Sequence, residues 1–242
     1  MIAEPFLQID NVSRHFGGLK AVDEVSFEVA RGEIVSIIGP NGAGKTTLFN
    51  LLTGQLPPSA GTVRFEGRDI GRTRSNERAR LGFGRTFQIS QTLTSMSVLE
   101  NGMVGAFMHE RRLPAAAARA FEALERVGLA KRATDKAGSL TLGERRRLEV
   151  ARALAMKPQI VLLDEVMAGL NQTEVAEIID MVHALNATGV TFLVIEHNLK
   201  VVRAFSRRVL VINRGRVLKQ GTAEEVLSDP AVVEAYVGKI RA

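Results

Sequence analysis

The chain has 242 residues, of which 45% are hydrophobic, 24% are charged and 5% are aromatic. This composition excludes a chain that is disordered throughout and provides enough apolar side chains for a sizeable core. The formal net charge of +6 is compatible with binding nucleotides, nucleic acid or an anionic membrane surface, and it does not choose among them. The lack of cysteine excludes structural disulfides and thiolate metal sites and fits a reducing compartment.

The apolar runs of the chain are short. Residues 160–163 and 209–212 are among the longest, and they are far shorter than the roughly 20 residues that a membrane helix needs. Residues 1–5 show no basic segment leading into an apolar stretch, so we expect no secretory signal peptide. We therefore expect no membrane span, and any work at a membrane would depend on partner proteins.

Short β-rich runs alternate with helical stretches along the first part of the chain, which is typical of an α/β protein. Residues 7–12 and 25–29 are predicted strands. Residues 34–38 form a buried strand that leads directly into a glycine-rich loop, and residues 45–52 then form a helix. A further strand is expected at residues 62–65, between Gly61 and Gly67.

The middle of the chain differs, because residues 97–127 are rich in Ala, Met, Leu and Arg with helical spacing. We expect a helical subdomain over about 89–155, with its border near Gln88, inside one domain of residues 1–242 whose core is about 1–88 and 156–242.

After this stretch the alternation returns: strands are predicted at 160–163, 191–195, 209–212 and 217–220, and helices at 174–185 and 198–205. Asp229 and Pro230 predict the start of a last helix, and Gly238 its end.

A phosphate-loop motif of the form G-x-x-x-x-G-K-[ST] follows the third predicted strand. Glycines let backbone N–H groups turn towards phosphate oxygens, and the following helix directs its positive end at them. Lys45 would neutralise the β- and γ-phosphate oxygens, and the Thr46 hydroxyl would ligate Mg²⁺. An ordinary glycine turn is the alternative. The residues predicted to surround the nucleotide here are Gly39, Pro40, Asn41, Gly42, Ala43, Gly44, Lys45, Thr46 and Thr47.

Two carboxylates, Asp164 and Glu165, follow the predicted buried strand at 160–163. A parallel strand would carry both to the carboxyl edge of its sheet, where ligands of open α/β sheets bind. Asp164 would then hold Mg²⁺ directly or through water, and Glu165 would activate the attacking water as general base. A solvated acidic turn is the alternative.

Together these motifs resemble the ATPase subunit of ABC transporters, from about residue 9 to residue 238. The resemblance implies a phosphate-loop NTPase core with a mostly parallel sheet, an antiparallel β subdomain and a helical subdomain, which binds ATP and Mg²⁺. Phe16 stands where the family stacks an aromatic ring on adenine, although a core phenylalanine is the alternative. Gln88 resembles the glutamine that senses Mg²⁺ and faces the membrane subunits, and His197 resembles the histidine that bonds the γ-phosphate.

The family's signature segment, commonly Leu-Ser-Gly-Gly-Gln, corresponds to Leu140-Thr141-Leu142-Gly143-Glu144. By resemblance, Thr141, Gly143 and Glu144 contact the nucleotide held by a second subunit, and Asn171 belongs to the loop after the acidic pair. Thr141 and Glu144 also satisfy a capping box, so we predict a helix start here. We expect the arginines at 145–147 to be mostly a solvated helix face.

Several phrases resemble the larger ATPase of branched-chain amino acid importers, among them the residues at 15–21, 85–88, 167–171 and 195–198. The resemblance implies transmembrane permease subunits, a second ATPase subunit, most simply a different protein although a homodimer is possible, and indirectly a solute-binding protein. It implies no nucleic acid, and a cytoplasmic location on the inner face of the membrane. Three alternatives remain: lipopolysaccharide-export ATPases, soluble ABC ATPases of DNA repair or translation, and phosphate-loop kinases or GTPases.

Overall fold

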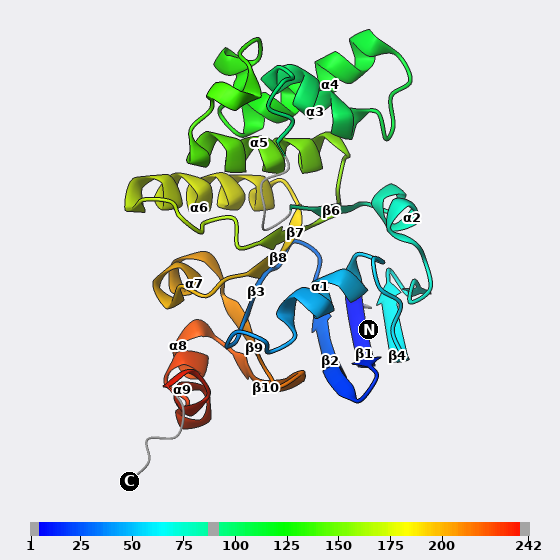
Figure 1. Cartoon of the computed structure of the whole chain (residues 1–242), viewed down its shortest axis with the longest axis vertical. Coiled ribbons are helices and arrows are strands. Elements are labelled where there is room, and N and C mark those ends of the chain that lie inside the picture. The colour runs from blue at the N-terminus through cyan, green and yellow to red at the C-terminus, as the bar shows by residue number, and fades with distance from the viewer. Residues whose placement is uncertain (1–4, 87–91, 238–242) are drawn as a thin grey trace. The chain divides into compact units, whose positions relative to one another are not determined.

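The computed structural model describes residues 5–86 and 92–237 (Figure 1). Gln88 and Gly238, both singled out above, lie outside the described residues. The chain divides into two compact units, residues 1–78 with 191–242, and residues 79–190. Each unit is described by itself.

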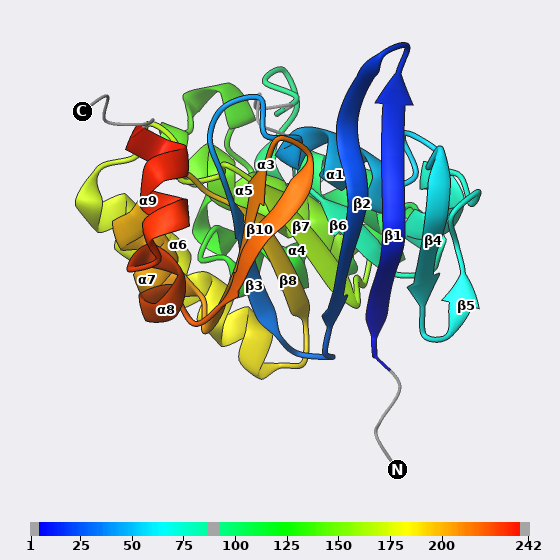
Figure 2. The same cartoon turned by 90° about the horizontal axis from the view of Figure 1, so that it is seen from below.

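The first unit contains an antiparallel sheet with strand order β2-β1-β4-β5 (Figure 2). Its strands are β1 (Leu7–Phe16), β2 (Leu19–Val29), β4 (Ala60–Phe65) and β5 (Arg68–Asp69). The predicted strands at 7–12 and 25–29 are the buried halves of β1 and β2, which pair to the hairpin tip, where Phe16 faces Leu19. The tip residues are exposed, so they lack the apolar alternation that reveals a strand.

A second, mostly parallel group of strands carries the glycine-rich loop. β3 (Ile34–Ile38) pairs in parallel with β8 (Thr191–Ile195) and with β9 (Arg208–Asn213), and β10 (Arg216–Gly221) pairs antiparallel with β9. All residues of β3 and β8 are buried, as expected for parallel strands covered on both faces. Two helices follow loops of this unit, α1 (Lys45–Leu52) after β3 and α7 (Leu199–Phe205) after β8. The shorter helices are α2 (Ser75–Arg80) and α8 (Ala223–Leu227).

The last helix, α9 (Pro230–Val237), begins as predicted. The Asp229 Oδ1 atom accepts a hydrogen bond from the Ala231 N–H at 2.9 Å, and Pro230 occupies the first helical position. Tyr236 of this helix packs against a buried cluster that includes Ile38, the residue just before the glycine-rich loop. The C-terminal helix therefore supports the end of β3 from which the loop departs.

The pKa of Tyr236 provides a test of this packing. Burial raises the pKa of the phenol, and the facing Gly39 N–H only partly opposes the effect. The unfolded state would therefore ionise first, so stability should fall as the pH rises above about 10, the usual tyrosine pKa. Because the chain has one tyrosine, the change in ultraviolet absorbance on phenol ionisation reports this residue alone. A phenol that titrates like free tyrosine would contradict the packing, and Tyr236→Phe should abolish this part of the pH dependence.

The second unit combines a parallel strand pair with helices. β6 (Phe83–Arg85) pairs with β7 (Ile160–Asp164). The three helices α3 (Val98–Ala106), α4 (Leu113–Arg126) and α5 (Leu142–Ala155) contact one another, and α6 (Gln172–Ala187) contacts α5. Gly105 lets α3 approach α5 closely, because a Cβ atom on it would lie 2.1 Å from the Arg152 carbonyl oxygen. The short 3-10 turns Ala130–Arg132 and Ala137–Ser139 lead from α4 to α5.

The α/β fold class is confirmed. Helices α3 and α4 lie within residues 97–127, where the sequence shows helical spacing, and α6 covers the helix predicted at 174–185. The sequence did not reveal β5, β6, α2 or α8, which are two to six residues long and too short for a periodic pattern. Within residues 5–86 and 92–237, none of the helices has both the length and the apolar character needed to cross a bilayer.

The expectation of a solvated arginine face at 145–147 is wrong. The Arg146 side chain is buried and pairs with Glu149 at 3.3 Å. Arg145 is held by backbone oxygens, since its Nη2 atom donates to Gly138 O at 2.8 Å and its Nε atom to Leu140 O at 3.0 Å. Arg147 is partly covered and lies 3.8 Å from Glu177. The prediction treated the three arginines alike because they are consecutive, but consecutive positions of a helix face different surroundings.

Candidate functional site

The glycine-rich loop requires glycine at both of its ends. Gly39 has φ +154°, and a Cβ atom there would lie 2.0 Å from the Ile212 carbonyl oxygen. Gly44 has φ +106°, and a Cβ atom there would lie 2.2 Å from the Ala21 carbonyl oxygen. Both approaches are far shorter than any contact a side chain could make. The loop is therefore fixed by backbone on both sides, and any other residue at these positions would displace it.

The Lys45 side chain lies against the glycine-rich loop that precedes it. Its side chain is 7% exposed, and its Nζ atom donates to Gly39 O at 2.8 Å and to Pro40 O at 3.0 Å. Helix α1 begins at Lys45, and its N-cap residue, Gly44, makes no side-chain cap hydrogen bond, so the positive end of the helix faces the loop. Thr46 is exposed and Thr47 is half-buried in the first turn. Charge and N–H donors thus meet in a geometry suited to phosphate groups.

The turn between β9 and β10 supports this loop, which the sequence did not indicate. The Gly215 N–H donates to Ala43 O at 2.9 Å, and Gly215 O in turn accepts from the Asp23 N–H at 2.8 Å. The Arg214-Gly215 pair has positive φ at both positions, a usual signal for a two-residue hairpin. The glycine at position 215, between two predicted strands, could have located the turn in the sequence, but not its contact with a loop so distant along the chain.

His197 follows strand β8 at the same edge of the sheet at which the phosphate loop follows β3. In the parallel pairing of β3 and β8, Ile37 lies opposite Ile195, so Gly39 and His197 each follow by two residues. The imidazole is exposed, while the preceding Glu196 is buried. The structure therefore places His197 and the loop on neighbouring strand ends, and His197 follows the strand at 191–195 as predicted.

Phe16 is at the tip of the β1–β2 hairpin and is 44% exposed, which rules out the core alternative. The guanidinium carbon of Arg14 lies 4.8 Å from the centre of its ring. A ring stacked on one side by a cation still has its second face for an aromatic base.

The acidic pair ends β7 in the second unit. The Asp164 side chain is almost fully buried, and its Oδ2 atom accepts from Arg85 Nη2 at 3.0 Å. The Asp164 backbone N–H donates to Thr86 Oγ1 at 3.2 Å. Glu165 has φ +50°, a left-handed conformation that costs a non-glycine residue about 1–2 kcal/mol. This conformation turns the chain sharply after Asp164, so the Glu165 side chain does not continue the alternation of the strand.

The predicted helix start at Thr141 is confirmed. Thr141 Oγ1 accepts from the Glu144 N–H at 3.2 Å, and Glu144 Oε2 accepts from the Thr141 N–H at 2.9 Å. Asn171 caps α6 in the same reciprocal way with Glu174. The two caps are adjacent, because a Cβ atom on Gly143 would lie 2.9 Å from Glu174 Oε1. The signature-like segment and the loop around Asn171 are thus brought together within the second unit.

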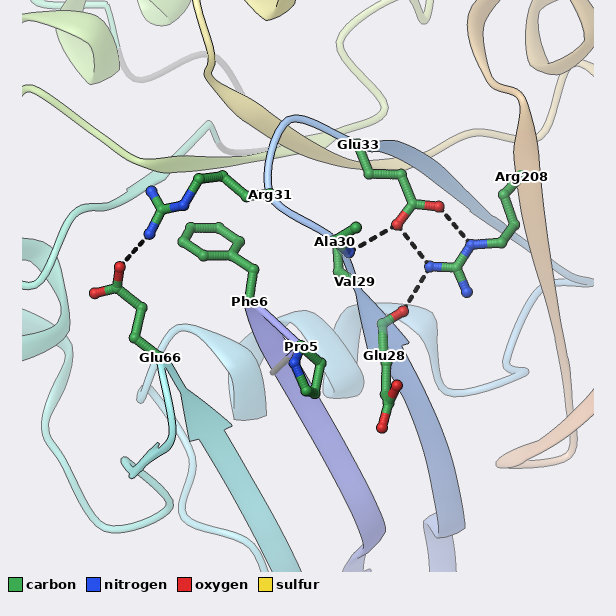
Figure 3. Close-up of a pocket in the computed structure, with 9 residues that line it drawn as sticks. All are labelled: Pro5, Phe6, Glu28, Val29, Ala30, Arg31, Glu33, Glu66 and Arg208. Carbon is green, nitrogen blue, oxygen red and sulfur yellow. Dashed lines mark hydrogen bonds and ion pairs between the residues drawn. The ribbon is translucent and has the colours of Figure 1, made fainter. Parts of the chain in front are cut away.

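A cavity of about 810 Å³ lies at the opposite end of β3 from the phosphate loop (Figure 3). Arg31 stacks over the Phe6 ring, with its guanidinium carbon 4.3 Å from the ring centre, and pairs with Glu66. Arg208 binds both carboxylate oxygens of Glu33, at 2.6 and 2.9 Å. Both arginines of this cavity are therefore paired within the protein, and we do not assign the nucleotide to it.

Comparison with known proteins identifies the family. Residues 22–168, more than half of the chain, match the ABC transporter family. The chain belongs to this family. The relatives include the high-affinity branched-chain amino acid transport ATP-binding protein LivG of Salmonella typhimurium, which is 41% identical over 98% of this chain and the whole of that protein. BraF of Pseudomonas aeruginosa carries the same description and is 38% identical over the same shares.

Solved structures of ABC transporter cassettes have the same fold. A nucleotide-free ATP-binding cassette matches with a TM-score of 0.90 and 35% identity, covering 97% of this chain and all of that one. A cassette in its ADP conformation matches with a TM-score of 0.90 and 35% identity over 98% of this chain and all of that one. The protein is thus an ABC-family ATPase that binds and hydrolyses ATP, as the phosphate loop predicts.

Proposed function

We propose that this ABC ATPase energises the import of branched-chain amino acids, or of a related small amide or acid, through separate permease subunits. The observation that carries the proposal is the Gly39–Thr46 loop, with Lys45 held against it and an uncapped helix start behind it. The names of the relatives, high-affinity branched-chain amino acid transport ATP-binding proteins, support the cargo. Permease partners would hold the protein at the inner face of the membrane.

On binding ATP, Lys45 would leave the Gly39 and Pro40 carbonyls and move to the β- and γ-phosphate oxygens. The N–H groups from Gly42 to Thr47 would surround the phosphates, and Phe16 would stack on adenine. His197, on the strand end next to the loop, would bond the γ-phosphate and steady the attacking water.

The donors assigned to Mg²⁺ fit that ion by their chemistry, since Mg²⁺ prefers hard oxygen ligands. Asp164 supplies a carboxylate, one oxygen of which contacts Arg85, and Thr46 supplies an exposed hydroxyl. Gln88, outside the described residues, would supply an amide oxygen. When bound, the ion would neutralise charge on the phosphate oxygens.

Glu165 would take a proton from the water that attacks the γ-phosphate. The signature-like segment, Thr141, Gly143 and Glu144, together with Asn171, would come from a second ATPase subunit and complete the site. Loss of the γ-phosphate would then release the two subunits, an order change of the kind that nucleotide switches use. We further propose that this second subunit is a different protein, that a solute-binding protein delivers the cargo, and that residues 89–155 act as a helical subdomain facing the permeases.

Replacing Lys45 by alanine should abolish both ATP binding and ATP-driven leucine uptake by vesicles containing the assembled transporter. The reason is that no other side chain of the loop neutralises the phosphate charge. A matched control is Lys219→Ala, which removes a surface lysine of the same unit that pairs with Asp229 at 3.0 Å. Binding of labelled ATP at equilibrium measures the effect. Normal binding by Lys45→Ala would contradict the assignment of the loop, and ATP hydrolysis without amino acid uptake would contradict the cargo.

A further inference from the structure

The start of α5 is unusually acidic for a segment that has to receive a phosphate. Glu144 stands in its first turn and accepts the Thr141 N–H at 2.9 Å. Glu174 lies against Gly143, where a Cβ atom would approach Glu174 Oε1 to 2.9 Å. A helix N-terminus carries only about half a positive charge, so each carboxylate beside it opposes the binding of an anion. The acidic first turn therefore needs a counter-charge if an anion is to bind.

Arg132 supplies that counter-charge from the 3-10 turn before α5. Its Nη1 atom donates to Glu144 Oε1 at 2.6 Å, its Nε atom bonds Asp135, and its Nη2 atom donates to Ser139 Oγ at 3.3 Å. The contact with Glu144 is partly screened from water, since the two side chains are 33% and 16% exposed. Arg145, by contrast, binds the carbonyls of Gly138 and Leu140 rather than a carboxylate.

The ionisation of Glu144 agrees with this arrangement. Burial alone would raise the pKa of the carboxyl, but the Thr141 N–H and the charge of Arg132 outweigh it and lower the pKa. Glu144 is therefore ionised at neutral pH. Both of its oxygens are occupied, one by the Thr141 N–H and one by Arg132, so the carboxylate is held beside the helix start and its charge is offset in part by Arg132, which also binds Asp135.

We propose that Arg132 is a positioning residue for ATP hydrolysis: it fixes Glu144 and offsets its charge in part, so that the N–H groups at the start of α5 can receive the γ-phosphate held by the second subunit. This inference rests on the proposed function. Position 144 carries a glutamate where the family commonly has glutamine. A glutamate is charged and needs a cationic partner such as Arg132, whereas a neutral glutamine would not. Arg132 acts through Glu144 and does not touch the nucleotide.

A double-mutant cycle in the assembled transporter tests this role. Arg132→Gln should raise the KM for ATP about tenfold or more with a smaller change in kcat, because the uncovered carboxylate repels the γ-phosphate. The same change in a Glu144→Gln background should shift KM by less than twofold. The defect of Arg132→Gln should also shrink as the ionic strength rises. A purely structural role of Arg132 would give neither the rescue nor the salt dependence.

Two further variants control for folding. Asp135→Asn removes the other carboxylate that Arg132 binds and should leave KM within about twofold. Arg132→Lys keeps the charge and should keep most of the affinity, which preserves the test if Arg132→Gln does not fold. Equal effects of Arg132→Gln in both backgrounds, in a transporter that hydrolyses ATP, would overturn this inference alone. A wild-type transporter without ATP hydrolysis would overturn the proposed function and this inference with it.

Discussion

Replacing Glu165 by glutamine is expected to lower ATP turnover by about two to four orders of magnitude while ATP binding changes by less than a few-fold. Glutamine has nearly the shape of glutamate, so the left-handed backbone at this position and the turn that follows it should persist. What is lost is the group that accepts a proton from the attacking water. ATP should consequently remain trapped between paired subunits.

Two measurements separate this outcome from a general defect. Steady-state phosphate release gives the turnover, and size analysis with and without ATP shows whether the subunits stay associated. Glu177→Gln is a suitable control, because it removes an exposed carboxylate of α6 that lies 3.8 Å from Arg147. Its turnover should equal that of the wild type within about twofold. A Glu165→Gln variant with normal turnover would remove the role assigned to Glu165.

Replacing Arg78 by methionine is expected to lower the free energy of unfolding by about 3–5 kcal/mol. The Arg78 side chain is fully buried, and its Nη1 atom donates to the carbonyls of Leu51 and Leu52, both at 2.7 Å. Its other nitrogens donate to the carbonyls of Ile70, Gly71 and Thr73. Methionine fills similar space but leaves these oxygens without their donor.

The expected loss is a large part of the 5–15 kcal/mol by which domains are usually stable. Burial lowers the pKa of the Arg78 guanidinium to about 10, so it stays charged at neutral pH and complements the negative end of helix α1. Arg78→Lys keeps the charge but has fewer donors, so it should fall between wild type and Arg78→Met. Urea unfolding measures the three proteins. A loss below about 1 kcal/mol for Arg78→Met would show that water replaces the guanidinium.

The sequence predicted most of what depends on local chemistry. The phosphate loop, the capping box at Thr141 and the start of α9 each follow from residue types within a few positions. The buried strands β3 and β8 were located to the residue, because their apolar runs are bounded by polar or turn residues.

What could not be predicted depends on contacts between distant parts of the chain. Arg78 reads as one more arginine in a basic stretch, and only the fold shows that five carbonyls converge on it. The contact of Arg85 with Asp164 could likewise not be predicted, because it depends on the pairing of β6 with β7. The misread arginine run has the same cause, since the environment of Arg146 is set by the helices packed around α5 and by nothing in its neighbours along the sequence.

The hairpin turn at Gly215 has a consequence for the order of events during synthesis. The glycine-rich segment emerges from the ribosome long before the Ile212 carbonyl and the Gly215 amide against which it rests. A nascent chain therefore cannot shape its nucleotide pocket until β9 and β10 have joined the sheet. The ability to bind ATP therefore waits for the synthesis of residues 208–221, which form β9 and β10.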